Sequence, residues 1–418
     1  MKKIYALLFA ATSVFSATAA VWDGTSTAIT AGSGTESDPY LIETPQHMAW
    51  FAEQVNAGNT FENQYFKLTD NLELGKSVNL TFPMIGKFDT YTDGSTQEEV
   101  DNSIAFMGIF DGDFHKIDDF KVEYFDEELG GTGLFAVTRS TTIIKNLILG
   151  ENSVVNGELV CGAMVGQMLG GTILNCENRA SVNGNMFTGG IVGCMEGGLV
   201  EGCINKGTIV GATEVGGIVG QGAYDGLVKA CINTAPVTAI GFGGAGIAGA
   251  LYDTFSLSNC YSIGAVTGQE NPYMGKPHAI VSDSGFNNKV TNCYYVLDLC
   301  GYSDSKATAK TADEMKAADI LPLLNNDIYE ATFVADSESK NGGFPALAWQ
   351  YDPRYGSVRE VAVDDLHIAV CGNSIIADED MMVFNLSGQT LAMGREVNLA
   401  KGCYLVRTAK GVTKVVIR

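Results

Sequence analysis

Residues 189–211 read GGIVGCMEGGLVEGCINKGTIVG, and residues 216–239 read GGIVGQGAYDGLVKACINTAPVTA. Both segments place a G-G-I-V-G start, a Leu-Val pair and a Cys-Ile-Asn step in the same order. Segments 161–184, 245–268 and 278–296 follow the same outline, the last of them only in part. The chain therefore contains an internal repeat, and repetition at a regular period is typical of stacked repeat architectures.

Two residue types mark the repeat independently. One is a cysteine in the second half of each segment, with successive steps of 27, 28, 29 and 33 along the sequence. The other is the glycine that closes the G-I-V-G element, with steps of 27, 27 and 29. The marker residues are Cys176, Cys203, Cys231, Cys260 and Cys293, and Gly166, Gly193, Gly220 and Gly249. Because both markers drift together, we interpret them as structural positions of one repeating unit.

Each unit contains two or three short β-prone pieces separated by Gly and Asn turns, such as residues 190–193 and 207–210. A strand of this length cannot bury a face alone, but stacked units share one continuous core. The pattern predicts an all-β fold, a right-handed parallel β-helix (solenoid) with short helical caps. A leucine-rich horseshoe has a similar period, but its Leu-x-x-Leu-x-Leu signature does not occur in these segments.

In a parallel solenoid the five marker cysteines form an inward column. Strands about 4.8 Å apart keep in-register Cβ atoms farther apart than the roughly 3.8 Å that a disulfide prefers. We therefore expect mostly free thiols that fill core volume, and the chain has no CxxC or Cys/His zinc spacing. Five asparagines are expected to be turn residues: Asn175, Asn205, Asn233, Asn259 and Asn292.

The ends of a solenoid need caps, because they expose apolar surface and unpaired strand edges. Residues 32–75 are the expected N-terminal cap, with a helix that starts after Thr44-Pro45. A capping box at Thr311 predicts a C-terminal cap helix over 311–325. The solenoid then spans 21–350, with its clearest repeats over 161–296, and residues 351–418 form a small C-terminal β-sandwich.

The composition narrows the class of function. The chain of 418 residues carries 48 acidic and 26 basic side chains, a formal net charge of −22. Such a chain repels phosphate backbones, so nucleic acid is not an expected partner. Residues 1–20 combine two lysines, an apolar run and an A-x-A-like exit, which predicts a secretory signal peptide. The mature chain has no expected transmembrane segment, and we expect it to be extracellular or attached to the outer surface.

An acidic residue follows each G-I-V-G element from the second repeat onward. These candidates are Glu196, Asp225, Asp253 and Asp283, with steps of 29, 28 and 30 between them. A row of carboxylates on one face would supply acid/base pairs for glycan cleavage, or ligands for Ca²⁺. The alternative is a set of solvated turn residues, and no lysine or arginine accompanies the row. No cofactor is expected, and calcium is the one metal that this pattern admits.

Two tyrosines stand beside the acidic residues. Tyr224 and Tyr252 are separated by about one repeat period, so they are expected on adjacent coils. A tyrosine joins an apolar ring to a polar tip, and two of them form a candidate platform for stacking sugars. The alternative is that they are exposed turn residues without a ligand.

Residues 30–350 resemble GLUG-motif repeat proteins. The resemblance is carried by segments 32–42, 110–117, 133–135 and 343–349 and by the repeats. Members of that family are exported bacterial β-solenoid proteins, often adhesin-like. The resemblance implies the architecture and leaves the activity open.

The C-terminal end of the chain resembles the sorting domain of the type IX secretion system of Gram-negative bacteria. Residues 381–389, 402–407 and 414–418 match its strand elements. The resemblance implies that residues 351–418 address the chain to the secretion machinery. Together these features predict a secreted, cell-surface-associated, non-catalytic binder of host or microbial glycans or proteins. A β-helix polysaccharide lyase or glycoside hydrolase is the alternative.

Overall fold

The computed structural model describes most of the chain. The described residues are 21–92, 99–125, 130–270, 276–284, 288–326, 328, 332–352, 368–371, 374–385, 390–400, 402–408 and 411–417. The predicted signal peptide, residues 1–20, lies outside them. Among the described residues no helix is long and apolar enough to cross a membrane.

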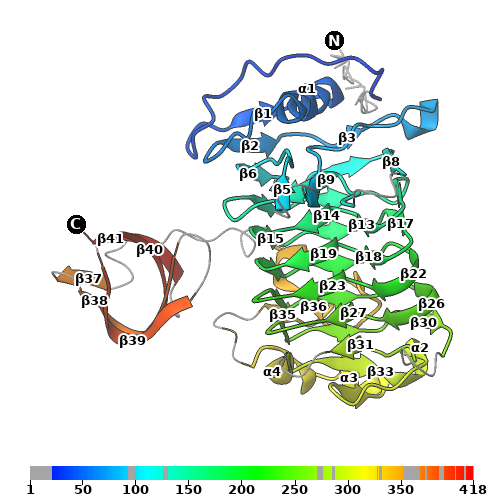
Figure 1. Ribbon diagram of the computed structural model, residues 1–418. Helices are drawn as coiled ribbons and strands as arrows, with labels where there is room; N and C mark the ends of the chain where they lie inside the picture. Colours follow the sequence, from blue (N-terminus) through cyan, green and yellow to red (C-terminus); the bar gives the residue numbers. More distant parts are fainter. Residues whose placement is uncertain are drawn as a thin grey trace, which may run out of the picture.

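The chain winds through four parallel sheets, here called S1 to S4, in a fixed order (Figure 1). S1 has nine strands, ordered β1 (Tyr40–Ile42), β2 (Tyr65–Leu68), β6 (Ile109–Asp111), β10 (Ile143–Lys145), β15 (Thr172–Leu174), β20 (Leu199–Glu201), β24 (Leu227–Lys229), β28 (Ser256–Ser258) and β32 (Lys289–Thr291). S2 has nine strands, ordered β3 (Leu72–Glu73), β7 (Lys116–Asp118), β11 (Ile148–Leu149), β16 (Glu177–Asn178), β21 (Ile204–Asn205), β25 (Ile232–Asn233), β29 (Tyr261–Ser262), β33 (Tyr294–Val296) and β34 (Thr308–Lys310).

The other two sheets complete each coil. S3 contains β8 (Lys121–Tyr124), β12 (Val154–Gly157), β17 (Ser181–Asn183), β22 (Ile209–Gly216), β18 (Phe187–Gly189) and β13 (Val160–Gly162), and β26 (Val237–Ala245) and β30 (Val266–Gly268) extend it from β22. S4 contains β9 (Phe135–Thr138), β14 (Val165–Met168), β19 (Val192–Glu196), β23 (Val219–Ala223), β27 (Ala248–Leu251) and β31 (Val281–Ser284). Each coil passes from S1 through S2 and S3 to S4, which confirms the predicted parallel β-solenoid.

The core follows from alternation along the short strands. Successive side chains of a strand point to opposite faces, so the middle residue of each S1 triplet points inward. Parallel register stacks these residues into one column, and its members from β6 to β28 are fully or almost fully buried: Phe110, Ile144, Ile173, Val200, Val228 and Leu257. Burying each such side chain contributes about 1.5–3 kcal/mol. The column is therefore a large part of what holds the coils together.

The five marker cysteines lie at the corner between S1 and S2. Their positions follow from the register on either side, where Leu174, Glu201 and Lys229 align before the corner and Glu177 and Ile204 align after it. All five are buried free thiols. Each Sγ donates to the carbonyl oxygen two residues earlier, at 3.2–3.4 Å. The thiol therefore fills the corner and also satisfies a backbone acceptor.

The asparagines belong to two columns, where the sequence predicts one set. Asn175, Asn259 and Asn292 precede their cysteines in the left-handed conformation, with φ of 50–56°. Asn205 and Asn233 instead point inward from S2, where Asn178 Nδ2 donates to Asn205 Oδ1 at 2.8 Å and Asn205 Nδ2 to Asn233 Oδ1 at 2.9 Å. The first group makes the turn, as expected, and the second forms a buried amide ladder across the coils.

The four marker glycines allow S4 to approach S3 closely. A Cβ atom on any of them would lie 2.2–2.8 Å from backbone atoms of a neighbouring segment, for example Thr188 N beside Gly220. The first three precede Gln167, Cys194 and Gln221, which are aligned along S4. The glycine column is therefore a steric requirement of the fold.

The N-terminal helix starts where the sequence predicts. Helix α1 (Pro45–Asn56) starts at an N-cap Thr44, whose side chain accepts from His47 N, and has Pro45 in its first turn. Its apolar face covers the first coil, and Phe51 contacts the rings of Phe66 and Phe106 at centroid distances of 4.6 and 5.1 Å. A short 3₁₀ helix, η1 (Lys76–Val78), and a hairpin of β4 (Thr90–Thr92) and β5 (Glu99–Asp101) complete this end.

The predicted C-terminal cap helix over 311–325 is wrong in its length. The capping box at Thr311 and Glu314 is present, but α3 (Ala312–Lys316) ends at Ala317, whose ψ is 153°. A second helix, α4 (Ile320–Leu324), follows. In one continuous helix Pro322 would stand in the interior, where it removes a hydrogen bond and clashes with the preceding turn. In α4 the proline lies in the first turn, where it is tolerated.

After α4 the chain returns along the outside of S2. This C-terminal strap, residues 332–352, contains β35 (Phe333–Val334), β36 (Ala346–Leu347) and the 3₁₀ helix η2 (Ala348–Gln350). With α2 (Leu297–Cys300), α3 and α4 it closes the last coils. Its residues Phe333, Phe344, Leu347 and Trp349 pack in one cluster with the S2 side chains Ile204, Ile232, Tyr261 and Tyr294.

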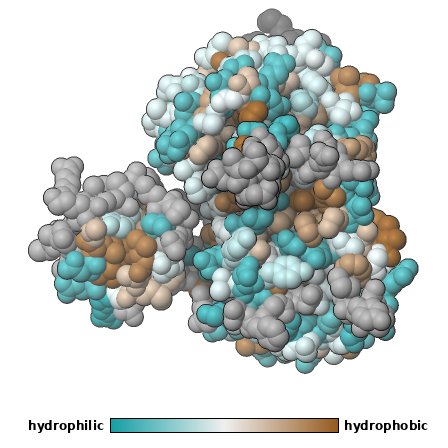
Figure 2. Space-filling model, viewed as in Figure 1, coloured by the Kyte–Doolittle hydropathy of each residue, from teal (hydrophilic) through white to brown (hydrophobic). Residues whose placement is uncertain are grey.

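The C-terminal region forms one five-stranded antiparallel sheet in its described residues. Its strands are β37 (Ile368–Cys371), β38 (Ser374–Phe384), β39 (Thr390–Asn398), β40 (Gly402–Thr408) and β41 (Gly411–Ile417). The sequence predicts a small sandwich, and all five described strands join a single sheet around the long β38. Hydrophobic surface gathers on this sheet in Figure 2, and β39 exposes Leu391 and Met393.

Candidate functional site

The four acidic candidates do not form one row. Register in S4 aligns Glu196 with Ala223, and it aligns Asp283 with Ala250 and thus with Gln221. In the next turn Thr254 Oγ1 donates to Asp225 Oδ1 at 2.5 Å, although the predicted neighbour of Asp225 is Asp253. The four residues therefore occupy different register positions of the coil, and this corrects the expected column.

The cause is that successive coils differ in length. Glu196 aligns with Ala223 at a step of 27, whereas Leu199 aligns with Leu227 at a step of 28, and β26 then carries one additional residue. Gly211 of β22 aligns with Ala239 of β26 at a step of 28, but Thr213 aligns with Phe242 at a step of 29. This bulge shifts everything after it, so that Gly222 aligns with Leu251. Residues that are equally spaced in the sequence therefore do not align in the structure, because a bulge places two residues of one strand opposite one residue of its neighbour.

The two tyrosines are displaced by the same shift. Tyr224 is exposed and has a left-handed φ of 56°, and Asp253 has the same φ at the matching point of the next coil. Tyr252 stands one position earlier in its turn, and its hydroxyl donates to Glu214 Oε1 at 3.0 Å. Glu214 also accepts from Gln221 Nε2 at 2.8 Å. Tyr252 thus belongs to a polar network, and the two rings do not form an aligned pair.

The calcium hypothesis receives no ligand set from these residues. Within the ranges that the structure describes, no group of three or more His, Cys, Asp or Glu side chains is placed to hold a metal ion. The acidic candidates are dispersed because their register differs. They consequently lack the convergent oxygen ligands that Ca²⁺ needs.

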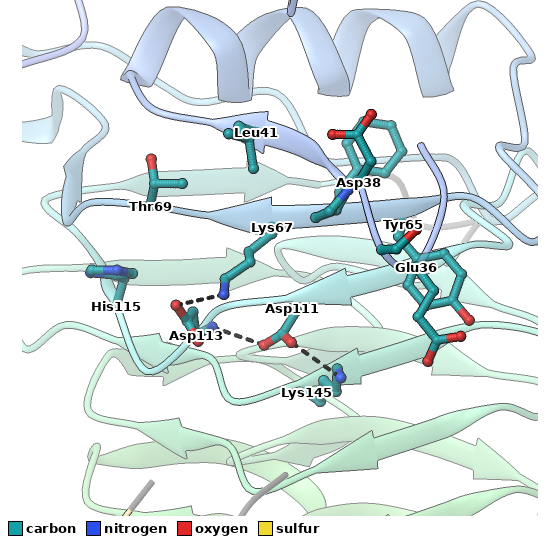
Figure 3. Close-up of a pocket in the computed structure, with 13 residues that line it drawn as sticks. Glu36, Asp38, Leu41, Tyr65, Lys67, Thr69, Asp111, Asp113, His115 and Lys145 are labelled. Atoms are coloured by element: carbon teal, nitrogen blue, oxygen red, sulfur yellow. Dashed lines mark hydrogen bonds and ion pairs between the residues drawn. The ribbon is translucent and has the colours of Figure 1, made fainter. Parts of the chain in front are cut away.

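A cleft of about 620 Å³ opens at the N-terminal end of the solenoid (Figure 3). Its floor is the outer face of S1, where Tyr65 and Lys67 of β2, Asp111 of β6 and Lys145 of β10 project outward. The turn after β6 contributes Asp113 and His115. The segment 36–39 overhangs this floor as a wall, and Leu41, Phe66 and Thr69 complete the lining.

Paired charges hold the floor of the cleft. Lys67 Nζ lies 2.9 Å from Asp113 Oδ2, and Lys145 Nζ lies 3.1 Å from Asp111 Oδ2. Asp111 Oδ1 also accepts from Asp113 N and from Asn146 Nδ2, both at 2.9 Å. Figure 3 shows the resulting chain from Lys67 through the two aspartates to Lys145. The four side chains thus present donors and acceptors in a pre-organised array.

A tight turn forms the overhanging wall. Thr35 N donates to Asp38 O and Asp38 N to Thr35 O, each at 3.2 Å, which places Glu36 and Ser37 at the tip. Tyr65 N donates to Gly34 O at 2.9 Å and ties the turn to β2. Gly34 has φ of +77°, and a Cβ there would lie 2.4 Å from the Tyr40 ring. The turn is therefore held by backbone bonds and by one aromatic contact.

The sequence did not reveal this cleft. Lys67, Asp111 and Lys145 occupy one register position of S1, but the steps between them are 44 and 34, whereas later coils repeat at 27 to 29. Long loops in the first coils hide the alignment. Two segments of the family resemblance do contribute to the cleft: 32–42 supplies the overhanging turn, and 110–117 supplies the turn from Asp111 to His115. These two motifs were the sequence feature that could have indicated the cleft.

Comparisons with known proteins concern the fold and one segment. No protein-family model matches the chain. The crystal structure, at 1.30 Å resolution, of a "putative immunoglobulin A1 protease" from Bacteroides ovatus superposes with a TM-score of 0.55 at 19% identity, over 76% of this chain and 94% of that one. A segment is 26% identical over 154 residues to halomucin of Haloquadratum walsbyi, which is 35% of this chain and 2% of halomucin. The chain thus spans about 2% of that relative, and at these identities the likeness to the solved structure shows the fold alone.

Proposed function

We propose that the chain is a secreted, surface-associated, non-catalytic β-solenoid that binds a glycan or protein ligand in the N-terminal cleft. The observation that carries this proposal is the cleft itself. It combines about 620 Å³ with charged, hydroxyl and aromatic side chains on a rigid sheet. Ligand sites commonly have volumes of about 300–1,000 Å³ and a few well-placed polar groups.

The enzymatic alternative is weaker on the same residues. Glycan hydrolysis needs two carboxyl groups facing one bond, about 5–10 Å apart. The acidic candidates of the repeats occupy different register positions. In the cleft, the carboxylates of Asp111 and Asp113 are each bound to a lysine ammonium group, so neither is free to face a glycosidic bond. A binding role fits this arrangement better.

Export is the second part of the proposal. The signal-like residues 1–20 and the strand motifs of 351–418 support secretion through a type IX pathway. Deleting residues 351–418 in the native host should leave the chain inside the outer membrane. Immunodetection on intact cells and in the medium measures this, and unchanged surface display would contradict the sorting role.

The binding experiment uses residues 21–418 on glycan and protein arrays. Thr69→Trp fills the cleft from an exposed position of its lining. Thr291→Trp, also exposed but on β32 at the far end of S1, is the matched control. We expect bound ligands to be lost with Thr69→Trp and kept with Thr291→Trp, while both variants unfold at the same temperature. Retention of every ligand by Thr69→Trp would place binding elsewhere.

The rival activity is tested on the same material. Incubation with a panel of host and plant glycans should release no new reducing or unsaturated ends. If products appear with the wild type and not with Asp225→Asn or Asp253→Asn, the chain is a glycan-cleaving enzyme and the non-catalytic proposal is wrong.

A further inference from the structure

We infer that the cleft selects a glycan that carries protonated amines, such as an oligomer of amino sugars, over neutral or acidic glycans. The inference rests on the proposed binding function of the cleft and assigns its ligand class. It starts from the charges: four carboxylates line the cleft, against two ammonium groups. Both ammonium groups, on Lys67 and Lys145, are already bound to aspartates at 2.9 and 3.1 Å.

The two remaining carboxylates belong to the overhanging turn. Glu36 and Asp38 are exposed, and among the described residues no lysine or arginine forms an ion pair with either of them. Figure 3 shows both on the overhanging segment, apart from the Lys67–Asp113 and Asp111–Lys145 pairs. The wall of the cleft therefore holds negative charge that the floor does not neutralise. A chain with a net charge of −22 strengthens the same field.

Each ligand class meets a different environment here. An acidic sugar would meet lysines whose charge is already balanced by aspartates, and its own carboxylate would approach Glu36 and Asp38. An ammonium group gains Coulomb attraction from these two acids, and the same cleft is lined by Tyr65, a residue type whose ring attracts cations. The hydroxyls of the sugar find donors and acceptors in the paired lysines and aspartates and in Ser37 and Thr69.

A basic peptide shares the positive charge but lacks the ring hydroxyls. The floor offers an alternating row of donors and acceptors, which suits adjacent hydroxyl groups of a sugar ring. A lysine side chain reaches such a floor with its ammonium group alone. The observations therefore favour the amino sugar, and an oligolysine is a competing probe in the test.

The experiment compares probes that differ in charge at constant length. Residues 21–418 are titrated calorimetrically with a chitosan hexamer, with its fully N-acetylated chitin counterpart, with an oligogalacturonate hexamer and with hexalysine. We expect the chitosan hexamer to bind at least tenfold more tightly than the chitin hexamer, with no oligogalacturonate binding and weaker hexalysine binding. Raising the salt concentration should reduce the preference, because exposed charges are screened.

Variants separate the cleft from the general acidity of the chain. Glu36→Gln and Asp38→Asn should each weaken chitosan binding by about threefold to fivefold, the range of one exposed ion pair, and leave chitin binding unchanged. Asp319→Asn removes one exposed carboxylate at the opposite end of the solenoid and should change neither.

Three results would overturn the inference: equal binding of chitosan and chitin, equal losses in all three variants, or stronger binding of hexalysine than of chitosan. In the first case the cleft still binds a glycan and the proposed function stands. If none of the four probes binds, the amine assignment fails, and the arrays with Thr69→Trp decide separately whether the cleft binds anything.

Discussion

Gly220 stands where strand β23 crosses against the backbone of the preceding coil. A Cβ there would lie 2.5 Å from Thr188 N and 2.6 Å from the carbonyl carbon of Phe187. Its φ is not in the left-handed region, so the requirement for glycine is one of space. The same holds at Gly166, Gly193 and Gly249, which explains why one residue type recurs at this point of every clear repeat.

Gly220→Ala is expected to destabilise the solenoid by about 3 kcal/mol, the upper end of the usual cost of overpacking, because backbone atoms must move to admit the methyl group. Gly197→Ala is the control, since nothing lies within 4 Å of its Cβ and only its φ of +100° opposes alanine. That variant should cost about 1 kcal/mol. Urea unfolding of both variants measures the difference, and equal losses would mean that crowding at Gly220 is relieved cheaply.

Buried thiols make stability depend on pH in the alkaline range. Burial raises the pKa of Cys161 and of Cys194 to about 12, and that of Cys300 to about 11. The folded state therefore favours the protonated thiol. This contribution is complete below the pKa of an unfolded thiol, about 8.5, and is lost as the pH rises toward the folded values.

We expect the free energy of unfolding to fall steeply between pH 9 and pH 11. The double variant Cys161→Ala, Cys194→Ala should show a shallower fall, by up to about 1.4 kcal/mol per pH unit for each thiol removed. Urea titrations at several pH values give both slopes. Parallel slopes would assign the alkaline loss to other groups, such as the buried Tyr261, whose pKa burial also raises.

Residue-scale prediction was limited by register. The thiol and glycine columns were predictable, because both markers lie where adjacent coils keep nearly equal lengths. The acidic row was not, since coil lengths vary between its members: Glu196 aligns with Ala223, two residues before Asp225, and β26 carries one additional residue after Ala239. A one-residue slip changes which side chains are neighbours, so spacing alone cannot assign a site in a loop.

At the scale of elements, the strap is anchored by Trp349. Its Nε1 donates to Gly202 O at 2.9 Å, and its ring stacks on Phe114 at a centroid distance of 5.4 Å. Tyr261 Oη also donates to Pro345 O. Segment 343–349 carries part of the family resemblance, but the sequence does not indicate which face it covers, because Gly202 and Phe114 are far from it in the chain.

Trp349→Ala should destabilise the protein by about 3–5 kcal/mol, the usual cost of emptying a buried aromatic site. Trp349→Phe keeps an aromatic ring but leaves Gly202 O without its donor, and should cost about 1–3 kcal/mol. Thermal unfolding monitored by far-UV circular dichroism compares the two variants. Near-equal losses would assign the role of Trp349 to the hydrogen bond and not to packing.

The cap helix shows how far local signals reach. The capping residues Thr44 and Thr311 were visible in the sequence, and both helices start where predicted. The helix that starts after Thr311 ends early, because Pro322 lacks the N–H that a continuous helix would need. The apolar pattern of 311–325 did not show this interruption. The start of a helix is thus determined by residues that are close in the sequence. The cleft near α1 is instead formed by strands that long loops separate in the sequence, so no local pattern predicts it.

For the whole molecule, the apolar clusters divide the chain in two. One cluster runs the length of the solenoid, and a second joins S2 to the strap. The cluster of the C-terminal sheet draws only on residues between Ile375 and Val406 in the part of the chain that the structure describes. The repeat predicted the first unit, and alternating strands predicted the second. The cleft was missed because it arises only when the irregular first coils are stacked.

This division predicts the effect of two truncations. A variant that ends at Asp352 keeps the solenoid and the strap, and should unfold within about 2 °C of the solenoid transition of residues 21–418, because no apolar cluster has been cut. A variant that ends at Ala307 loses β34, α3, α4 and Trp349, and it exposes the S2 residues Ile204, Ile232 and Tyr261. Its unfolding temperature should be at least about 10 °C lower, because each kcal/mol of lost stability lowers that temperature by about 2–4 °C in a large domain. Differential scanning calorimetry at matched concentration measures both. Equal destabilisation by the two truncations would make the C-terminal sheet part of the cap of the solenoid and would contradict the division into two units.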